Sequence, residues 1–367
     1  MRVLLTHERF APDFGGGGEA MVLAIARHLI HAGVTVRVLT TGDPYSTDYE
    51  GISTIRLPIS RYAMNLAVPT IAKLAQEVDL IQTFNYHACL SSLLGGKLSR
   101  KPVVCTFLGL IQETWTDMRG PLLGRMWMFW EKLLVRRNFS RLLFLTEDNR
   151  EAAIHLGADR KRTVVNVPGI VAGEFSPAAV KDNIVVFVGK FDVRKGIFDV
   201  LEVARALPCV PFFMIGWGSR EAELRSMAPA NVRIFTQPQR AVIRDCVGRA
   251  AIFLLPSRGE GFPVALLEAM AAGCAVVASV PLHFEGFRVA PGDRTAMIRA
   301  IAALWQNPAE ARRLGETNIG LANQYSWDEH VNRLLQVYRE VLDERHRPIP
   351  LKDLHGNENR NHTSLHF

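Results

Sequence analysis

Two glutamates bracket the start of a short apolar helix, and their spacing can put a carboxylate at each end of a diphosphate ligand. Glu260 lies in a loop with glycines, and Glu268 follows eight residues later inside the run VALLEAMAA. The helix N-terminus between them offers unpaired N–H groups and a partial positive charge, which favour phosphate. Because carboxylates accept hydrogen bonds from sugar hydroxyls, one glutamate can hold a ribose and the other a second sugar.

The alternative for each glutamate is a solvated surface residue. Glu260 by itself gives no reason to prefer a ligand over water. Glu268 lies in an otherwise apolar helix, and charged residues are seldom buried without a partner. We therefore expect Glu268 to have a partner.

The segment around these glutamates predicts a strand, a loop and a helix in direct succession. Residues 251–255 are a continuous apolar run, typical of a parallel strand covered on both faces, and Pro256 ends it. Pro263 suits the first turn of the helix, where its missing N–H costs nothing. Gly273 suits a left-handed C-terminal cap, so the predicted helix is about ten residues long.

A run of four glycines follows the first predicted strand of the chain. Residues 3–6 form that strand and residues 34–40 the next, with Gly33 ending the helix between them. This βαβ unit predicts a parallel sheet. The apolar positions of the helix recur at helical spacing: Met21, Val22, Ile25, Leu29 and Ile30.

The glycines of this run, Gly15 to Gly18, stand directly before the helix. Without side chains, they let backbone N–H groups approach a phosphate closely, although four bare glycines fit a flexible loop equally well. The G-x-G-x-x-G spacing of a nicotinamide dinucleotide site is missing, so that class of ligand is not favoured.

A second loop with glycines carries cations. Residues 183–188 form an apolar strand that leads into the loop GKFDVRKG, with Lys190, Arg194 and Lys195. These side chains can neutralise a diphosphate, and the alternative is a solvated turn. Gly216 follows another predicted strand, where parallel strand ends line nucleotide sites.

Length, composition and charge limit the class of protein. A chain of 367 residues predicts two domains, and 48% hydrophobic with 22% charged residues is globular. No apolar run is long enough to cross a bilayer, and the first segment, MRVLLTHERF, is too short in apolar residues for a signal peptide. The five cysteines are scattered without a C-x-x-C, which predicts reduced core residues and no zinc site.

The net charge of +7 is compatible with nucleic acid, an anionic membrane surface or a phosphorylated substrate. No nucleic-acid-binding motif is visible, so nucleic acid is not expected as a partner. Residues 118–143 mix aromatic and basic side chains, which suits docking on an anionic membrane surface. A core helix with solvated arginines explains this segment equally well.

The run from Pro256 to Glu268 resembles the signature P-S-R-x-E-G-F-P-x-x-x-x-E of family 4 glycosyltransferases, and all eight defined positions agree. The glycine run with Glu19 and the lysine loop resemble two further family motifs. Residues 167–177 resemble the family's crossover into its second domain. The family is retaining and uses a nucleotide-sugar donor.

The resemblance implies the α/β fold called GT-B, in which two Rossmann-like domains face each other across a cleft. We expect an acceptor-side domain over residues 1–170 and a donor-binding domain over 171–325. A helix over 326–345 then returns to the first domain, with Ser326 as its N-cap. The polar tail 346–367 is expected to be disordered.

The resemblance also implies roles for individual residues. Glu260, Lys195 and Lys190 are the expected catalytic residues, with the two lysines stabilising the departing diphosphate. No Asp-x-Asp is present, so neither a metal nor any other cofactor is expected. The expected donor-binding residues are Gly15, Gly16, Gly17, Gly18, Gly189, Lys190, Arg194, Lys195, Gly216, Gly261, Phe262, Pro263 and Glu268.

The chain departs from the family at three places around the expected site, and also in the crossover, where Pro168 and Val171 replace Asn and Asp. Leu108-Gly109 stands where His-Gly is usual, Lys190 stands in place of Arg, and the loop after residue 279 is shortened and lacks its glycines. His87 can partly substitute for the missing histidine on the acceptor side, together with Gly109.

These features predict a retaining glycosyltransferase that acts in cell-surface glycan, lipopolysaccharide or glycolipid biosynthesis. Its expected location is the cytoplasm, on the inner face of the membrane if residues 118–143 dock there on a lipid-linked acceptor. Two alternatives remain open: a non-catalytic partner that binds a nucleotide sugar, and a peripheral membrane scaffold.

Overall fold

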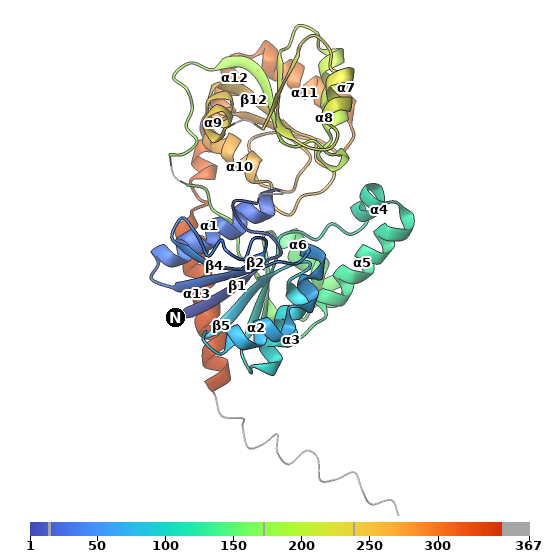
Figure 1. Ribbon diagram of the computed structural model, residues 1–367. Helices are drawn as coiled ribbons and strands as arrows, with labels where there is room; N and C mark the ends of the chain where they lie inside the picture. Colours follow the sequence, from blue (N-terminus) through green and yellow to red (C-terminus); the bar gives the residue numbers. More distant parts are fainter. Residues whose placement is uncertain (14–15, 172, 238, 347–367) are drawn as a thin grey trace, which may run out of the picture.

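The computed structural model describes residues 1–13, 16–171, 173–237 and 239–346. The chain forms two lobes, each built on its own β-sheet with helices packed against it (Figure 1). The expected disordered tail, apart from His346 at the end of the last helix, and one predicted site residue, Gly15, lie outside the described residues.

The first lobe contains an eight-stranded sheet in the order β3-β4-β2-β1-β5-β6-β7-β8. Every pairing is parallel except that of β3 with β4. The strands are β1 (Arg2–Thr6), β2 (Thr35–Thr41), β3 (Asp48–Tyr49), β4 (Ile52–Leu57), β5 (Leu80–Phe84), β6 (Val103–Phe107), β7 (Arg141–Phe144) and β8 (Thr163–Val165).

Helices cover both faces of this sheet because successive side chains of a strand point to opposite faces. Val3 and Leu5 of β1 belong to one buried cluster, and Leu4 between them belongs to the other. The helices of this lobe are α1 (Gly17–His31), α2 (Val68–Ala75), α3 (Cys89–Leu98), α4 (Thr114–Arg119), α5 (Pro121–Val135) and α6 (Glu147–His155), with short 3-10 turns η1 (Arg61–Leu66) and η2 (Arg160–Arg162).

The second lobe contains a six-stranded parallel sheet in the order β11-β10-β9-β12-β13-β14. Its strands are β9 (Asp182–Lys190), β10 (Phe212–Trp217), β11 (Val232–Thr236), β12 (Ala250–Leu255), β13 (Ala275–Ala278) and β14 (Gly286–Arg288). Its helices are η3 (Val193–Lys195), α7 (Ile197–Ala206), α8 (Glu221–Met227), α9 (Arg240–Arg249), α10 (Val264–Ala271), α11 (Arg294–Gln306) and α12 (Pro308–Ala322).

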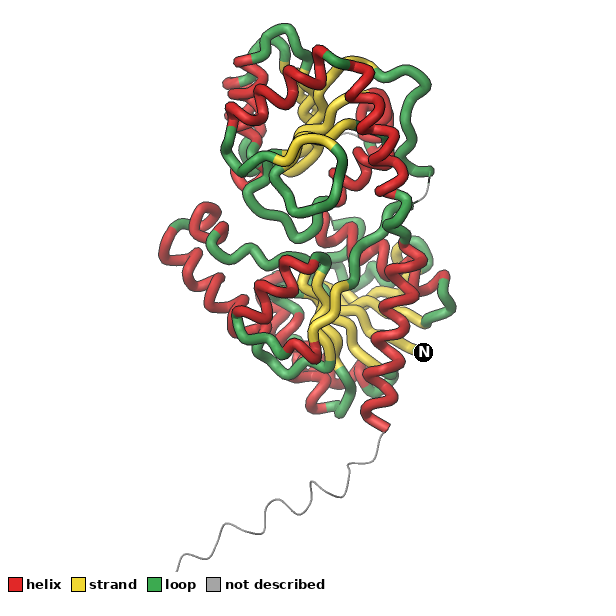
Figure 2. Tube along the Cα trace, turned by 180° about the vertical axis from the view of Figure 1, so that it is seen from behind, coloured by secondary structure: helices red, strands yellow, loops and turns green. Residues whose placement is uncertain are grey.

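The last helix, α13 (Trp327–His346), returns to the first lobe and lies along it (Figures 1 and 2). Ser326 caps it as predicted, because its hydroxyl accepts a hydrogen bond from the N–H of Glu329 at 3.0 Å. The Tyr338 side chain is fully buried, and its hydroxyl lies 3.2 Å from Oε1 of Gln82 on β5. The predicted GT-B architecture, with its returning helix, is therefore confirmed.

The composition of the aromatic and basic segment 118–143 suggested one helix, but the structure divides this segment. Gly120 has a φ of +79° and separates α4 from α5, and the segment ends in strand β7. The two helices cross at Gly124, where an added Cβ would lie 2.5 Å from Cα of Thr116. Together they project from the first lobe as a hairpin (Figure 1).

Three smaller predictions were wrong. Ile30 is 38% exposed, although its spacing placed it on the buried face of α1. Cys209 is exposed, whereas the other four cysteines are buried. Pro263 is the N-cap of α10 and not part of its first turn, so the helix has eight residues. Gly273, in contrast, has the predicted left-handed backbone, with a φ of +72°.

His330 on α13 is buried where the connection between the lobes meets this helix. Its Nδ1 lies 2.9 Å from the carbonyl oxygen of Val167, and burial lowers the pKa of the imidazole to about 4. The unfolded chain therefore takes up a proton at a higher pH than the folded protein does. The contribution of the neutral His330 to the free energy of unfolding is therefore fully present above the ordinary pKa of 6.5 and is lost as the pH falls toward 4.

We predict that His330 makes the protein lose about 2 kcal/mol of unfolding free energy between pH 7 and pH 5. Urea denaturation at the two pH values measures this loss. His330→Gln should lose correspondingly less stability over the same range, and His283→Gln, at an exposed position, should behave like the wild type. Equal pH dependence in wild type and His330→Gln would contradict the assignment.

Candidate active site

Glu260 is a buried carboxylate in the loop between β12 and α10, and cations surround it. Its side chain is 6% exposed, and its Oε1 accepts hydrogen bonds from Nζ of Lys195 and from Oγ of Ser257, both at 2.6 Å. Nη1 of Arg194 lies 3.5 Å from the other carboxylate oxygen. Burial by itself raises the pKa of Glu260, but these cations and hydrogen bonds outweigh it and hold the pKa below its ordinary value.

The turn η3 fixes Lys195 and Arg194 beside this carboxylate. The Asp192 side chain caps the turn by accepting a hydrogen bond from the N–H of Lys195, and Gly196 ends it with a left-handed φ of +70°. A Cβ at Gly196 would lie 2.3 Å from the carbonyl oxygen of Pro256, so the turn packs directly on the strand end before Glu260. Arg194 also donates to the carbonyl oxygen of Gly259 at 2.6 Å.

Glu268 on α10 has a partner, as its place in an apolar helix required. Its Oε1 accepts a hydrogen bond from Nη2 of Arg240 at 2.6 Å, and Arg240 also contacts Glu174 at 2.9 Å. Burial raises the pKa of Glu268, and Arg240 offsets only part of that effect because the arginine side chain is half exposed. The arginine's own pKa is raised, so the pair itself is favourable and the burial of the carboxylate is what costs.

Glycines let the strand ends of the second lobe approach one another. A Cβ at Gly216 on β10 would lie 1.8 Å from the carbonyl oxygen of Gly189, and a Cβ at Gly189 would lie 3.7 Å from Cδ of Lys195. Three predicted donor residues, Gly189, Gly216 and Lys195, therefore lie together at the carboxyl ends of β9 and β10. Lys190, the last residue of β9, is exposed beside them.

The loop with Glu260 also touches the first lobe. A Cβ at Gly261 would lie 1.7 Å from the carbonyl oxygen of Leu108, and a Cβ at Gly109 would lie 3.1 Å from Cα of Gly261. Leu108 in turn reaches the glycine run, because a Cβ at Gly18 would lie 3.2 Å from its Cδ1. Residues 256–263, between β12 and α10, are called the signature loop below. Leu108 thus contacts both the glycine run and the signature loop.

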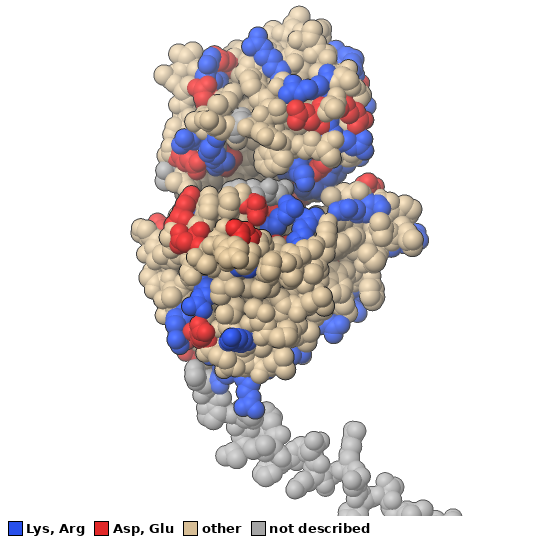
Figure 3. Space-filling view, viewed as in Figure 1, with Lys and Arg blue, Asp and Glu red and all other residues tan. Residues whose placement is uncertain are grey.

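Figure 3 shows Lys and Arg side chains along the junction of the two lobes, on the side of α4.

Two asparagines that the sequence analysis missed hold this contact. Asn149, in the first turn of α6, donates from Nδ2 to the carbonyl oxygen of Gly261 at 3.0 Å. Asn85 donates to the carbonyl oxygen of Gly109 at 3.0 Å and accepts from the N–H of Leu108 at 2.8 Å. A side-chain amide both donates and accepts, which suits it to pin a loop backbone.

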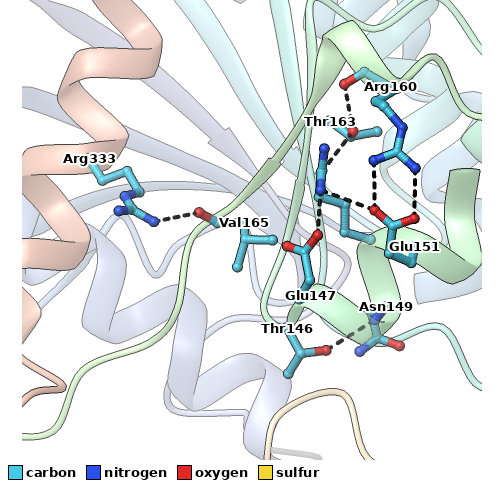
Figure 4. A network of polar contacts seen from close by, with 9 residues as sticks. Thr146, Glu147, Asn149, Glu151, Arg160, Thr163, Val165 and Arg333 are labelled. Atoms are coloured by element: carbon cyan, nitrogen blue, oxygen red, sulfur yellow. Dashed lines mark hydrogen bonds and ion pairs between the residues drawn. The ribbon is translucent and has the colours of Figure 1, made fainter.

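A polar network fixes α6 and hence Asn149 (Figure 4). Thr146 caps the helix by accepting from the N–H of Asn149 at 3.2 Å. Further along the helix, Glu151 forms two hydrogen bonds with Arg160, at 2.9 and 2.8 Å, and the carbonyl oxygen of Arg160 accepts from Thr163 of β8. Arg333 of α13 donates to Val165 on the same strand.

His87 lies in an aromatic cluster of the first lobe. Its ring packs edge-on against Tyr62 at 5.1 Å and against Trp127 at 5.6 Å, and burial lowers its pKa. Trp115 stacks on Trp127 at 5.1 Å, and its indole N–H is buried without a hydrogen-bond partner among the described residues. His87 and Gly109 belong to the same lobe: the Tyr86 ring packs against Trp127, as His87 does, and the Tyr86 hydroxyl lies 3.0 Å from the carbonyl oxygen of Gly109.

The remaining predicted donor residues lie at the start of α1 and in the loop between β12 and α10. Gly16 precedes α1, and Gly17 is its first residue. Phe262 is 8% exposed and its ring lies 6.3 Å from that of Tyr325, so its side chain belongs to the buried core. Pro263 then caps α10.

A cavity of about 600 Å³ lies elsewhere, beside the last turns of α13. Its basic lining residues are Lys97, Arg100, Lys101, Arg141, Arg162 and Arg345, and none of them belongs to the motif loops. In the part of the chain that the structure describes, no group of three or more His, Cys, Asp or Glu side chains could hold a metal ion.

Comparison with known proteins identifies the family. Residues 182–307 match the family model described as glycosyl transferases group 1, and residues 16–169 match the glycosyl transferase 4-like domain. The two matches together span most of the chain.

The chain is a group 1 glycosyl transferase of the family 4 type. Among characterised relatives of this glycosyltransferase, phosphatidyl-myo-inositol mannosyltransferase of Mycobacterium tuberculosis is 26% identical over 90% of this chain and 94% of the relative. GDP-mannose:cellobiosyl-diphosphopolyprenol alpha-mannosyltransferase of Xanthomonas campestris is 23% identical over 93% of this chain and 97% of the relative.

Solved structures agree on the fold of the glycosyltransferase. Sucrose-phosphate synthase from Thermosynechococcus elongatus superposes with a TM-score of 0.78 at 22% identity, covering 94% of this chain and 99% of that protein. Anabaena HepE, solved in complex with UDP and glucose, superposes with a TM-score of 0.74 at 16% identity, covering 94% and 99%.

Because Lys195 of the glycosyltransferase forms an ion pair with Glu260, substituting this lysine tests how much the pair stabilises the fold. Lys195→Met leaves the buried Glu260 with the neutral Ser257 hydroxyl and the more distant Arg194, so we expect a loss of roughly 3–5 kcal/mol of unfolding free energy at pH 7. Because the folded pKa of Glu260 is lowered, its contribution is present above the ordinary value of 4.5 and disappears as the pH falls through the folded pKa. The difference in unfolding free energy between wild type and Lys195→Met should therefore shrink as the pH falls.

Lys190→Met is the matched control, since Lys190 is exposed at the same strand end. It should change unfolding free energy by no more than about 0.5 kcal/mol. Chemical denaturation from pH 7 to pH 4 measures both variants. Equal stability of the two variants at pH 7 would show that the Lys195–Glu260 pair does not hold the loop.

Proposed function

We propose that this glycosyltransferase moves a hexose from a nucleoside diphosphate sugar to a hydroxyl of a lipid-linked acceptor, with retention of configuration. The observation that carries the proposal is the buried Glu260 carboxylate, bound by Lys195 and Arg194, in a loop that contacts Leu108 and Gly109 of the opposite lobe. A donor held there lies between phosphate-binding cations and an acceptor-side surface.

The donor diphosphate would meet Lys190, Arg194, Lys195 and the N-terminus of α10. These groups stabilise the charge that develops on the departing nucleoside diphosphate, so we infer that transfer needs no metal. Glu260 would accept hydrogen bonds from the transferred sugar, and Glu268 from the ribose. The glycines would allow the close approach of backbone N–H groups: Gly16, Gly17, Gly18, Gly189, Gly216 and Gly261.

Retention would follow from attack on the same face from which the diphosphate leaves, with a donor phosphate oxygen taking the proton of the acceptor hydroxyl. The sugar's anomeric carbon then exchanges its bond to the phosphate oxygen for a bond to the acceptor oxygen. No covalent nucleophile on the protein enters this mechanism.

GDP-mannose is the first donor to test. Two sets of sequence relatives are named as mannosyltransferases, and one of these names specifies GDP-mannose. The HepE structures were solved with UDP and with UDP-glucose, at identities too low to transfer a donor. A thermal-shift screen of GDP-, UDP- and ADP-sugars would rank base and sugar together.

The acceptor would be presented at an anionic membrane surface by the α4–α5 hairpin. Its solvent-facing apolar side chains include Leu122 at 83%, Met126 at 56% and Phe129 at 65% exposure. This exposure disfavours the alternative of a core helix whose arginines alone face water. No helix among the described residues is both long and apolar enough to span a bilayer. Docking on the cytoplasmic face would suit a nucleotide-sugar donor and a lipid-linked acceptor.

Glu268→Ala should weaken the binding of GDP by roughly 1–3 kcal/mol, because a charged hydrogen-bond acceptor for the ribose is lost. Isothermal titration calorimetry measures the effect. Glu174→Ala is the control, since it removes the other partner of Arg240 and keeps the carboxylate of Glu268. If both variants bind GDP like the wild type, Glu268 is a structural residue.

Replacing Leu122 and Phe129 together with Gln should weaken binding to vesicles containing phosphatidylglycerol by at least about tenfold, since each buried side chain contributes about 1.5–3 kcal/mol. Vesicle sedimentation measures it. Leu98→Gln, 70% exposed on α3, is the matched control and should bind like the wild type. Equal binding of all three proteins would exclude docking through α5.

The sequence also allows a partner that binds a nucleotide sugar without transferring it. Release of GDP from GDP-mannose by the wild type, with or without acceptor, would exclude this alternative. Tight donor binding without turnover of any donor in the screen would favour it. Vesicle binding by a protein that binds none of the nucleotides in the screen would instead favour the membrane scaffold.

A further inference from the structure

Glu131 on α5 is a fully buried carboxylate outside the motifs described so far. Its exposure is 0%, and the four hydrogen-bond donors that it has among the described residues are all neutral groups. A buried carboxylate without a cation is unfavourable unless hydrogen bonds occupy its oxygens. An apolar side chain at this position would leave these donors unpaired, so the role of the carboxylate lies in the segments that carry them.

The donors come from two segments of the acceptor-side lobe. The Tyr86 hydroxyl lies 2.6 Å from Oε1 of Glu131, and the N–H of Ile111 donates to the same oxygen at 3.2 Å. Gln112 donates to Oε2 from its backbone N–H at 3.0 Å and from its side-chain amide at 2.6 Å. The carboxylate therefore binds the loop that connects β6 with α4.

Asn85 holds the start of this loop at Leu108 and Gly109, and Glu131 holds the residues that follow. Leu108 to Glu113 lie outside any helix or strand, and Gln112 has a left-handed φ of +37°, which is strained for a residue with a side chain. Two successive N–H groups of the loop end on Glu131. The carboxylate thus replaces the hydrogen bonds that a sheet or helix would otherwise supply.

The other side of the loop faces the signature loop of the second lobe. Gly109 contacts Gly261, and the Tyr86 hydroxyl also lies 3.0 Å from the carbonyl oxygen of Gly109. At the far end of the loop, a Cβ at Gly259 would lie 3.3 Å from Oγ1 of Thr114. Gly261 therefore contacts the segment that Glu131 holds, and Gly259 lies beside the first residue of α4, directly after that segment.

We propose that Glu131 is a positioning residue for glycosyl transfer: it holds residues 109–112 in the conformation that packs against the loop of Glu260. The proposal rests on the proposed function, since it assigns Glu260 to the donor sugar. Glu131 touches neither donor nor acceptor. Its loss should misplace the reacting groups and lower turnover while donor binding to the second lobe persists.

The test compares Glu131→Gln with Glu113→Gln. The first keeps the side-chain volume and replaces one acceptor oxygen by an NH₂ group that faces N–H donors. The second removes a carboxylate from an exposed position of the same loop. Turnover of GDP-mannose at saturating donor should fall on the order of 100-fold in Glu131→Gln, the scale expected when reacting groups are misplaced by about 1 Å.

Calorimetric affinity for GDP should stay within about threefold of the wild type in both variants, because the side chains proposed to bind the nucleotide, Lys190, Lys195 and Glu268 among them, lie in the other lobe. Glu113→Gln should keep wild-type turnover. Wild-type turnover in a folded Glu131→Gln protein would overturn the proposal. So would a loss of GDP affinity equal to the loss of turnover, because the effect would then lie in donor binding.

Hydrogen exchange supplies a readout that needs no substrate. The amides of Ile111 and Gln112 should exchange at least about tenfold faster in Glu131→Gln than in the wild type or Glu113→Gln. If the wild type turns over no donor, the proposed function fails while this measurement still decides whether Glu131 holds the loop. Unchanged exchange at both amides would refute the positioning role.

Tyr86→Phe and Gln112→Ala each remove one side-chain donor and leave the carboxylate in place, so they serve if Glu131→Gln does not fold. Each should lower turnover by roughly 3–10-fold at an unchanged melting temperature. Combined with Glu131→Gln, each should add little, because all three act through one network. Turnover that falls only in step with melting temperature would mark the network as structural.

Discussion

The Glu260 carboxylate is buried at the junction of the two lobes, and the arrangement of the surrounding loops follows from keeping its charge there. Lys195 and Ser257 bind one oxygen, Arg194 approaches the other, and the cap by Asp192 holds the two cations in place. A charge without these partners would be strongly disfavoured. The cations that stabilise Glu260 are also those proposed to meet the donor diphosphate, so fold stability and ligand binding depend on the same side chains.

Close approach of backbones is the second requirement of this junction. Gly261 lies so near the carbonyl oxygen of Leu108 that no side chain fits, and Gly216 stands in the same relation to Gly189. These glycines are needed for packing whether or not they also approach a phosphate. Leu108, which departs from the family motif, contributes its backbone to one contact and its side chain to another, beside Gly18.

The α4–α5 hairpin connects the surface of the first lobe with this junction. On one side it exposes large apolar residues, among them Leu122 and Phe129. On the other it buries Glu131 against residues 111 and 112, and its first residue, Thr114, lies beside Gly259. We propose both membrane docking and support of the loop for α5. Together these roles would bring a lipid-linked acceptor close to the loop that holds the donor.

Local signals in the sequence determined the parts of this protein that depend on neighbours in the chain. Continuous apolar runs predicted the strands, Ser326 predicted the start of α13, and Gly273 predicted a left-handed helix end. The signature from Pro256 to Glu268 predicted the family, which the comparisons confirmed. All of these depend on residues a few positions apart, whose geometry the backbone alone restricts.

Only the tertiary structure decided which residues meet across the chain. Glu268 needed a partner, but nothing in its helix pointed to Arg240, and no motif pointed to Asn149, Asn85 or Glu131. The split of 118–143 at Gly120 and the exposure of Ile30 likewise follow from what packs against each segment. Composition and spacing show that a charge must be paired or a loop held. Folding brings distant segments together, and it is their contact in space that selects the partner.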